Sequence, residues 1–197
     1  MVANRGYQST GTKTRFRLID AAAELLAEEG YPAITARRIA SRAGLKPQLV
    51  HYYFRSMEEL VVTVFNRSSA IYFRLHDEAL SSPYPLRALW ELNSNMPETS
   101  RMMEFVALAK QYPLLRTEMR KSGESFRALQ IEAIKGVYER RGVTRPQVSA
   151  EALAMMMSAI ARSMVLERQV GLDAAHDEAN ATIVSYLAAI EGAPPDT

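Results

Sequence analysis

Apolar side chains recur every three to four residues along almost the whole chain, which is the period of an α-helix. No stretch of the sequence alternates polar and β-branched residues in the way that a half-buried strand requires. Glycine and proline interrupt the pattern, at Gly30, Gly44, Pro113 and Gly171 among others, and such residues mark helix ends. The sequence therefore predicts an all-α protein of about nine helices.

The expected helices divide the chain into a tail, a small head and a larger body. Residues 1–13 are rich in Gly, Ser and Thr and are predicted to form a mobile basic tail. Residues 14–56 are predicted to form a head of three helices, two of them short. Ser56 and Glu59 have the spacing of a capping box, which is expected to open the first long helix of the body, residues 57–192.

The positive charge of the chain is concentrated at one end. Residues 1–56 contain nine Lys and Arg against four Asp and Glu, whereas residues 57–197 contain fifteen against eighteen. This asymmetry is typical of a protein that presents one end to a polyanion. The sequence has no cysteine and no apolar run of the roughly 20 residues that span a bilayer. We therefore expect a cytoplasmic protein without a membrane partner.

The segment "LKPQLVHYYFR", residues 45–55, has two different faces when it is placed on a helix at about 100° per residue. Val50, Tyr53 and Phe54 fall on one side and are expected to pack against the head. Polar and basic side chains gather on the other side. Exposed Tyr and His on a short helix are often only surface packing. However, the preceding short helix, the connecting turn and the charge asymmetry favour a helix-turn-helix that enters the major groove of DNA.

Each polar side chain of this region suits a particular contact with DNA. Gln48 can bond bidentately to adenine, and Leu49 can contact a thymine methyl group. Arg37, Tyr52 and Arg55 suit phosphates, and the start of the second helix also favours a phosphate. The candidate DNA-binding residues are Thr35, Arg37, Lys46, Pro47, Gln48, Leu49, His51, Tyr52 and Arg55.

Several motifs in residues 14–62 resemble the DNA-binding domain of the TetR family of bacterial transcriptional regulators. They are "AAAELLAEEG" in the first helix, "TARRIASRAG" in the second, "YYF" at the end of the third and "SMEEL" after it. The sequence departs from the usual family pattern at Lys46, His51 and Met57, with Arg55 placed to compensate for Met57. The resemblance implies an all-α homodimer that binds a palindromic operator, with an effector-binding and dimerisation body. It also implies release from DNA when a small effector binds.

The body contains large and adaptable side chains that are candidates for an effector pocket. They are Phe65, Tyr72, Trp90, Met96, Met102, Met103, Phe105, Tyr112 and Phe126. Such residues at helical spacing are more often plain core, but as a group they favour a mainly apolar effector. An effector there is expected to shift the helix that begins at Ser56 and so to change the separation of two recognition helices.

The last two helices carry long apolar stripes, which the resemblance assigns to a four-helix dimer interface. The candidate interface residues are Leu153, Met157, Ile160, Met164, Ile183, Leu187 and Ile190. The alternative is that these stripes close the core of their own chain.

Enzyme motifs and metal-ligand spacings are missing from the sequence. His76 and His176 each begin the triplet "HDE", but neither has a good ligand at helical spacing, and both triplets are interpreted as solvated surface. The sequence contains no phosphate-binding loop, dinucleotide fingerprint or nucleophile elbow, so no cofactor is expected. Two other classes stay open: a DNA-binding protein whose body binds a protein or nothing, and a sequence-indifferent nucleoid binder.

Overall fold

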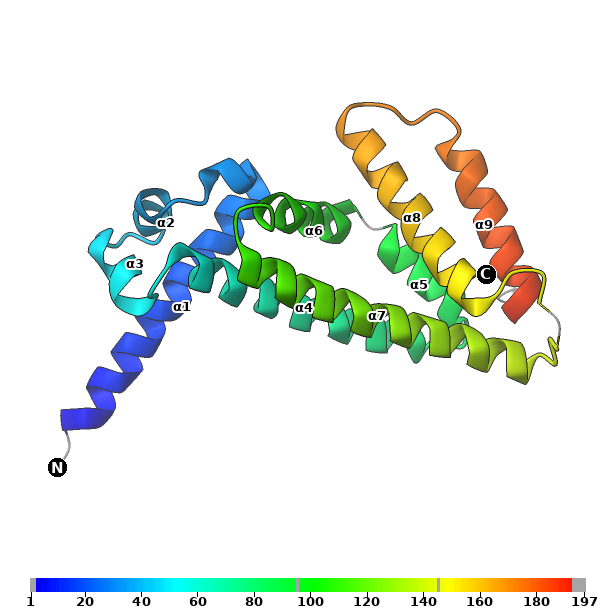
Figure 1. The fold of residues 1–197 in the computed structure, drawn as a ribbon, viewed down its shortest axis with the longest axis horizontal. Helices are drawn as coiled ribbons and strands as arrows, with labels where there is room; N and C mark the ends of the chain where they lie inside the picture. Colours follow the sequence, from blue (N-terminus) through cyan, green and yellow to red (C-terminus); the bar gives the residue numbers. More distant parts are fainter. Residues whose placement is uncertain (1–2, 95, 145, 193–197) are drawn as a thin grey trace. The chain divides into compact units, whose positions relative to one another are not determined.

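The computed structural model of the protein describes residues 3–94, 96–144 and 146–192, with side chains from residue 11 onward except 96–98. Within these ranges the chain forms nine α-helices, one short 3-10 helix and no strand, which confirms the all-α prediction (Figure 1). The helices are α1 (Ala3–Glu29), η1 (Tyr31–Ala33), α2 (Ala36–Arg42), α3 (Gln48–Tyr53), α4 (Met57–Leu80), α5 (Pro85–Asn93), α6 (Met96–Leu108), α7 (Pro113–Arg140), α8 (Ala150–Gln169) and α9 (His176–Glu191).

Helix α1 begins at Ala3 rather than near Thr14, so the segment predicted to be a tail continues the first helix. Residues 3–13 contain no proline, and helix propagation adds one backbone hydrogen bond for each residue that joins an existing helix. Gly6 and Gly11 weaken this segment but do not block a helical backbone. Composition alone gave too much weight to these glycines.

The chain packs as two compact units, each assembled from two stretches of sequence. The N-terminal unit comprises Met1–Ser69 and Arg101–Met119, and the C-terminal unit comprises Ala70–Ser100 and Arg120–Thr197. Neither unit ends at residue 56, where the sequence pattern placed the boundary between head and body. The difference arises because the first turns of α4 and parts of α6 and α7 pack with the head.

Two side-chain carboxylates attach the segment 101–119 to the rest of the N-terminal unit. Glu104 accepts a hydrogen bond from the backbone N–H of Tyr31 at 2.8 Å. Glu58 accepts one from the backbone N–H of Leu114 at 2.7 Å, in the first turn of α7, where free N–H groups need acceptors. The core of this unit contains residues from α1, α2, α4 and α6, which explains why it is larger than three helices.

The C-terminal unit has its own core, in which α5 packs against α8 and α9 (Figure 1). The buried carboxylate of Glu191, at the end of α9, accepts hydrogen bonds from the backbone N–H groups of Leu86 and Arg87, each at 2.8 Å. Burial raises the pKa of Glu191, and the hydrogen bonds from the first turn of α5 oppose that shift. The guanidinium of Arg141 donates to the carbonyl oxygen of Glu191, so three segments meet at one residue.

None of the described helices is both long enough and apolar enough to cross a bilayer.

Candidate nucleic-acid interface

The two short helices are held in a fixed relation by a cap and a tight turn. Thr35 caps α2, and its hydroxyl oxygen accepts a hydrogen bond from the backbone N–H of Arg38 at 3.3 Å. After α2, the backbone N–H of Leu45 donates to the carbonyl oxygen of Ala40 at 2.8 Å. Gly44 has φ +64°, a left-handed conformation that glycine adopts without strain. The chain therefore reverses in few residues and starts α3 directly.

Helix α3 has the two faces that its sequence predicts. Val50 and Phe54 are each 1% exposed and belong to the core of the N-terminal unit. His51 and Tyr52 lie on the outside, and Tyr52 is 70% exposed. Gln48 is also exposed, at the start of the helix, where side chains of a recognition helix reach base edges. The helix is thus anchored on one side and presents polar groups on the other.

The remaining candidate DNA contacts lie around the same face. Thr35, Arg37, Lys46, Pro47 and Arg55 are all exposed. Leu49 is half-buried, which leaves part of its side chain accessible. Pro47 is the N-cap of α3 rather than its first helical residue. All nine candidates are thus at least partly exposed, and their contacts with DNA stay a prediction.

Not every basic residue of the head is available to a polyanion. Arg38 forms an ion pair with Glu29, and Arg42 pairs with Glu28 at 2.8 Å and with Glu29 at 3.1 Å. The hydrogen bond that Arg42 donates to Glu28 raises the pKa of Arg42. These acids of α1 neutralise the second and third arginines of α2.

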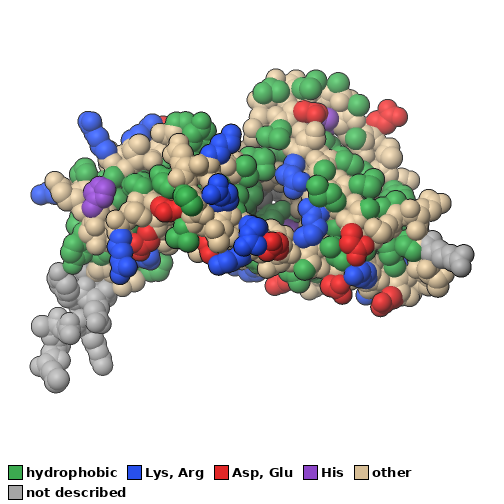
Figure 2. Space-filling model, in the orientation of Figure 1, with side chains coloured by type: hydrophobic (Ala, Val, Ile, Leu, Met, Phe, Trp, Pro, Cys, Tyr) green, Lys and Arg blue, Asp and Glu red, His purple; other side chains and the backbone are tan. Residues whose placement is uncertain are grey.

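Three other basic residues of the head keep their charge unopposed. Arg37, Lys46 and Arg55 take part in no ion pair among the described residues. Figure 2 shows Lys and Arg side chains spread over the part of the surface formed by α2 and α3. Unpaired cations that flank an exposed polar helix are what phosphate contacts require.

Two arginines of α1 support α3 and the turn in a way that the sequence did not suggest. The guanidinium of Arg17 donates to the carbonyl oxygen of Ala43, the C-cap of α2. Arg15 lies over the ring of Phe54, 4.9 Å from its centroid, in a cation–π contact. Both residues contributed to the charge count, but no sequence pattern identifies their partners, which are more than 20 residues away.

The junction between α3 and α4 is also held by side chains. Ser56 accepts a hydrogen bond from the backbone N–H of Glu59 at 3.1 Å, as the capping-box spacing predicts. The carboxylate of Glu59 accepts from the backbone N–H of Arg55 at 2.8 Å, rather than from Ser56 itself. The position of Arg55 is therefore coupled to the first turn of α4.

The candidate effector-pocket residues divide between the two units. Phe65, Met102, Met103, Phe105 and Tyr112 belong to the N-terminal unit, and Tyr72, Trp90 and Phe126 to the C-terminal unit. Phe65 and Phe105 are fully buried against each other, with ring centroids 5.3 Å apart. The side chain of Met96 lies outside the described residues.

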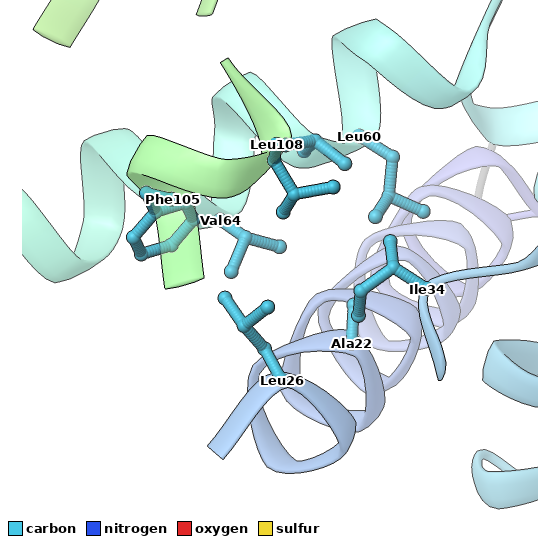
Figure 3. Close-up of a pocket in the computed structure, with 8 residues that line it drawn as sticks. Ala22, Leu26, Ile34, Leu60, Val64, Phe105 and Leu108 are labelled. Atoms are coloured by element: carbon cyan, nitrogen blue, oxygen red, sulfur yellow. The ribbon is translucent and has the colours of Figure 1, made fainter. Parts of the chain in front are cut away.

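A cavity of about 10 Å³ lies beside Phe105 in the core of the N-terminal unit. Ala22, Leu26, Ile34, Leu60, Val61, Val64, Phe105 and Leu108 line it. Figure 3 shows side chains converging from α1, α4 and α6 and, in the case of Ile34, from the segment that follows η1. This volume is at the lower limit for one water molecule, so the cavity is a packing gap rather than an effector pocket.

In the C-terminal unit, two of the pocket candidates meet a histidine. The rings of Tyr72 and Phe126 are 5.0 Å apart, and both contact His76, which is 0% exposed. His176 is 5% exposed, so the interpretation of both histidines as solvated surface was wrong. Each histidine shares a helix with exposed acids but faces inward, because consecutive helical residues point about 100° apart.

Most of the candidate dimer residues are buried within their own unit. Leu153, Met157, Met164, Ile183 and Leu187 are at most 9% exposed and form the core with α5, while Ile160 and Ile190 are partly buried. These stripes therefore close their own core, the alternative that the sequence left open. The reason is that α5 covers them, and the amphipathic pattern does not reveal which helix provides the cover.

A family model matches residues 18–64, which span the end of α1, the helix-turn-helix and the start of α4. The model describes bacterial regulatory proteins of the tetR family. Residues 18–64 are therefore similar to the tetR family. The proteins that this region resembles are regulators and not enzymes, as the sequence analysis expects.

Two relatives match about a third of the chain in sequence. One is the HTH-type transcriptional regulator BetI of Rhizobium meliloti (strain 1021), 34% identical over 68 residues, which are 34% of this chain and 32% of that protein. The other is the fatty acid metabolism regulator protein of Bacillus subtilis (strain 168), 29% identical over 62 residues, 32% of each chain. The chain thus matches about a third of the length of these relatives.

Solved structures extend the likeness in fold to most of the chain. A protein from Saccharomonospora viridis, solved in complex with choline, has a TM-score of 0.76 and 21% identity, and the match covers 89% of this chain and 96% of that one. A TetR transcriptional regulator from Chloroflexus aurantiacus has a TM-score of 0.75 and 19% identity, with 91% and 96% covered. At this identity the likeness establishes the fold of the body but not its ligand.

Proposed function

We propose that the protein is a DNA-binding transcriptional regulator that inserts α3 into the major groove. The proposal rests on the two faces of α3. Val50 and Phe54 anchor its inner face in the core, whereas its outer face exposes Gln48, His51 and Tyr52. The match of residues 18–64 to the tetR-family model and the likeness to two regulators support it. Gln48 is assigned to a base edge, and the unpaired cations around it to phosphates.

The regulator is proposed to bind as a homodimer, because one short recognition helix reads only a half-site. The buried stripes of α8 and α9 are not available to a second copy, so the exposed faces of these helices are the candidates. Met155, Met156 and Leu166 of α8 are 54%, 45% and 44% exposed. On α9, small residues that include Ala181 and Ser185 lie on an exposed face, where another helix can approach closely. A two-fold dimer predicts a palindromic operator.

The regulator is also proposed to be a repressor that a small effector releases from DNA. Helix α4 starts beside Arg55 in the N-terminal unit and continues through Tyr72 and His76 in the C-terminal unit. A ligand held by Tyr72 and His76 can change the position of α4 and thereby that of α3, the recognition helix that precedes it. The choline complex of the Saccharomonospora viridis protein supports ligand binding in a body of this fold.

Selection from a library of random-sequence duplexes tests the DNA-binding proposal. The purified protein is expected to enrich a two-fold-symmetric motif whose half-sites are about 34 Å apart or a multiple of that distance. Diffuse recovery with a steep dependence on salt would instead indicate a sequence-indifferent binder. A matched selection with Gln48→Ala is expected to relax one base position in each half-site.

A further inference from the structure

The C-terminal unit contains a buried polar cluster that its own packing does not explain. Tyr72 and His76 come from α4, Asn93 ends α5, and Phe126 comes from α7, where it directly precedes Arg127. The ring centroids of Tyr72 and His76 are 4.4 Å apart, and the ring of Phe126 lies 5.0 Å from the first and 4.9 Å from the second. Three helices thus place aromatic walls around polar groups, and several of those groups lack partners.

His76 presents a hydrogen-bond acceptor inside the unit. Its Nδ1 lies 3.0 Å from the carbonyl oxygen of Tyr72, and a carbonyl only accepts, so Nδ1 carries the proton. Burial lowers the pKa of His76, so the ring is neutral and Nε2 keeps its lone pair. Nε2 is buried and has no hydrogen-bond partner among the described residues. Because buried acceptors are usually hydrogen-bonded, Nε2 is a candidate to accept a hydrogen bond from a ligand.

Asn93 presents a donor close by. It is 7% exposed, and its Oδ1 accepts a hydrogen bond from the hydroxyl of Tyr72 at 2.9 Å. In this orientation of the amide, Nδ2 is buried and has no hydrogen-bond partner among the described residues. Through Tyr72, a donor on Asn93 and an acceptor on His76 are held in one rigid arrangement.

Arg127 adds positive charge that no carboxylate of the described chain balances. Its Nη1 is buried without a hydrogen-bond partner, and it forms no ion pair among the described residues. Burial lowers the pKa of Arg127, and the positive charge of Arg162 lowers it further. Two neighbouring cations without a counter-ion disfavour a cationic ligand and favour an anion.

We propose that this cluster holds the effector and that the effector is a hydroxy acid with an apolar or aromatic body. The ligand hydroxyl donates to Nε2 of His76, and the ligand carboxylate accepts from Arg127 and from Nδ2 of Asn93. The rings of Tyr72 and Phe126 contact the apolar body. This inference rests on the proposed effector response and refines it, because an entirely apolar compound would leave the three polar groups unpaired. A quaternary amine such as choline would meet Arg127 and Arg162.

Matched sets of compounds on benzene, naphthalene and eight-carbon chain scaffolds test the proposal. Each set contains the hydroxy acid, the acid alone, the alcohol alone and the trimethylammonium analogue. We expect a hydroxy acid from at least one set to raise the melting temperature most, with the acid and the alcohol each binding about tenfold more weakly by calorimetry. Preferential binding of the amines, or binding of no hydroxy acid in any set, would overturn the proposal.

Single substitutions test which side chains of the protein contact the ligand. His76→Phe keeps a ring but removes the acceptor, and Arg127→Met removes the positive charge. Each substitution is expected to weaken binding of the hydroxy acid by about tenfold or more. Arg120→Met removes an exposed arginine from the same helix and is the matched control, with unchanged affinity expected. Circular dichroism verifies that each variant is folded. In the wild-type protein, nitrogen NMR of the His76 ring is expected to show Nε2 becoming hydrogen-bonded on titration, and an unchanged Nε2 signal would contradict the assignment.

Operator binding, measured separately, distinguishes this inference from the proposed function. If the protein binds a symmetric operator but no hydroxy acid, the ligand assignment is wrong and the regulator proposal stands. If a hydroxy acid binds at His76 and Arg127 but no DNA sequence is preferred, the ligand assignment stands and the regulator proposal is wrong.

Discussion

The carboxylate of Glu59 accepts a hydrogen bond from the backbone N–H of Arg55, with 2.8 Å between the two atoms. Arg55 is the last basic residue of the helix-turn-helix, and Glu59 lies in the first turn of α4, which continues into the C-terminal unit. The recognition region and the long helix are therefore joined by a side chain as well as by the backbone.

Removing the cap of α4 should destabilise the protein. Ser56→Ala removes the hydroxyl that accepts from the backbone N–H of Glu59, and such caps contribute about 1 kcal/mol to stability. We expect the free energy of unfolding, measured with urea, to fall by that amount. Ser41→Ala, at an exposed position inside α2, is the control and should change stability by less than about 0.5 kcal/mol. If the two substitutions lowered the free energy of unfolding equally, Ser56 would not act as a stabilising cap.

Base reading and phosphate binding should separate in two variants. Gln48→Ala should weaken operator binding by about 1–3 kcal/mol and relax the preference at one base position. Arg55→Ala should weaken operator and random duplexes alike and reduce the slope of log affinity against log salt by about one. Fluorescence anisotropy on both duplexes over a range of salt measures these effects. If Gln48→Ala lost the same affinity for the operator and for the random duplex, the assignment of Gln48 to a base would be wrong.

The faces of α8 should respond differently to substitution. Met157 is 3% exposed and lies in the core, so Met157→Ala should lower the free energy of unfolding by about 2–5 kcal/mol. Met156 is 45% exposed, so Met156→Glu should leave each chain folded but separate the proposed dimer. Sedimentation and circular dichroism together distinguish the two results. A Met156→Glu protein that remains dimeric would place the interface elsewhere.

Stability should decline in mildly acidic solution because of His76. Burial holds the pKa of His76 below its ordinary value of 6.5, so the unfolded chain binds a proton that the folded chain rejects. The stabilisation is therefore complete above that ordinary value and is lost as pH falls toward the folded pKa. We expect urea unfolding to show a lower stability at about pH 5.5 than at about pH 7.5. His76→Gln should reduce this pH dependence, whereas His51→Gln, an exposed histidine, should preserve it.

Local patterns in the sequence were sufficient for the helix-turn-helix. The angle of about 100° per residue separates Val50 and Phe54 from His51 and Tyr52, and the structure has the same separation. The capping residues Thr35 and Ser56 were also identifiable, because a cap acts within three residues of itself.

Features that depend on distant partners were not predictable from one sequence. The apolar stripes of α8 and α9 were recognisable, but nothing in them indicates that α5 covers Leu153 and Leu187 within the same unit. Likewise, the acids next to His76 suggested a solvated face, whereas its burial follows from contacts with α7. The clamp from Arg17 to Ala43 crosses 26 residues, and periodicity carries no signal for it.

The most direct test of DNA reading compares the affinity of the wild-type protein for the selected operator and for a scrambled duplex of the same composition, at one moderate salt concentration. We expect the operator to bind at least about 10³-fold more tightly. The operator should also carry protein chains in pairs. Equal affinities for the two duplexes would contradict the assignment of α3 as a sequence-reading helix.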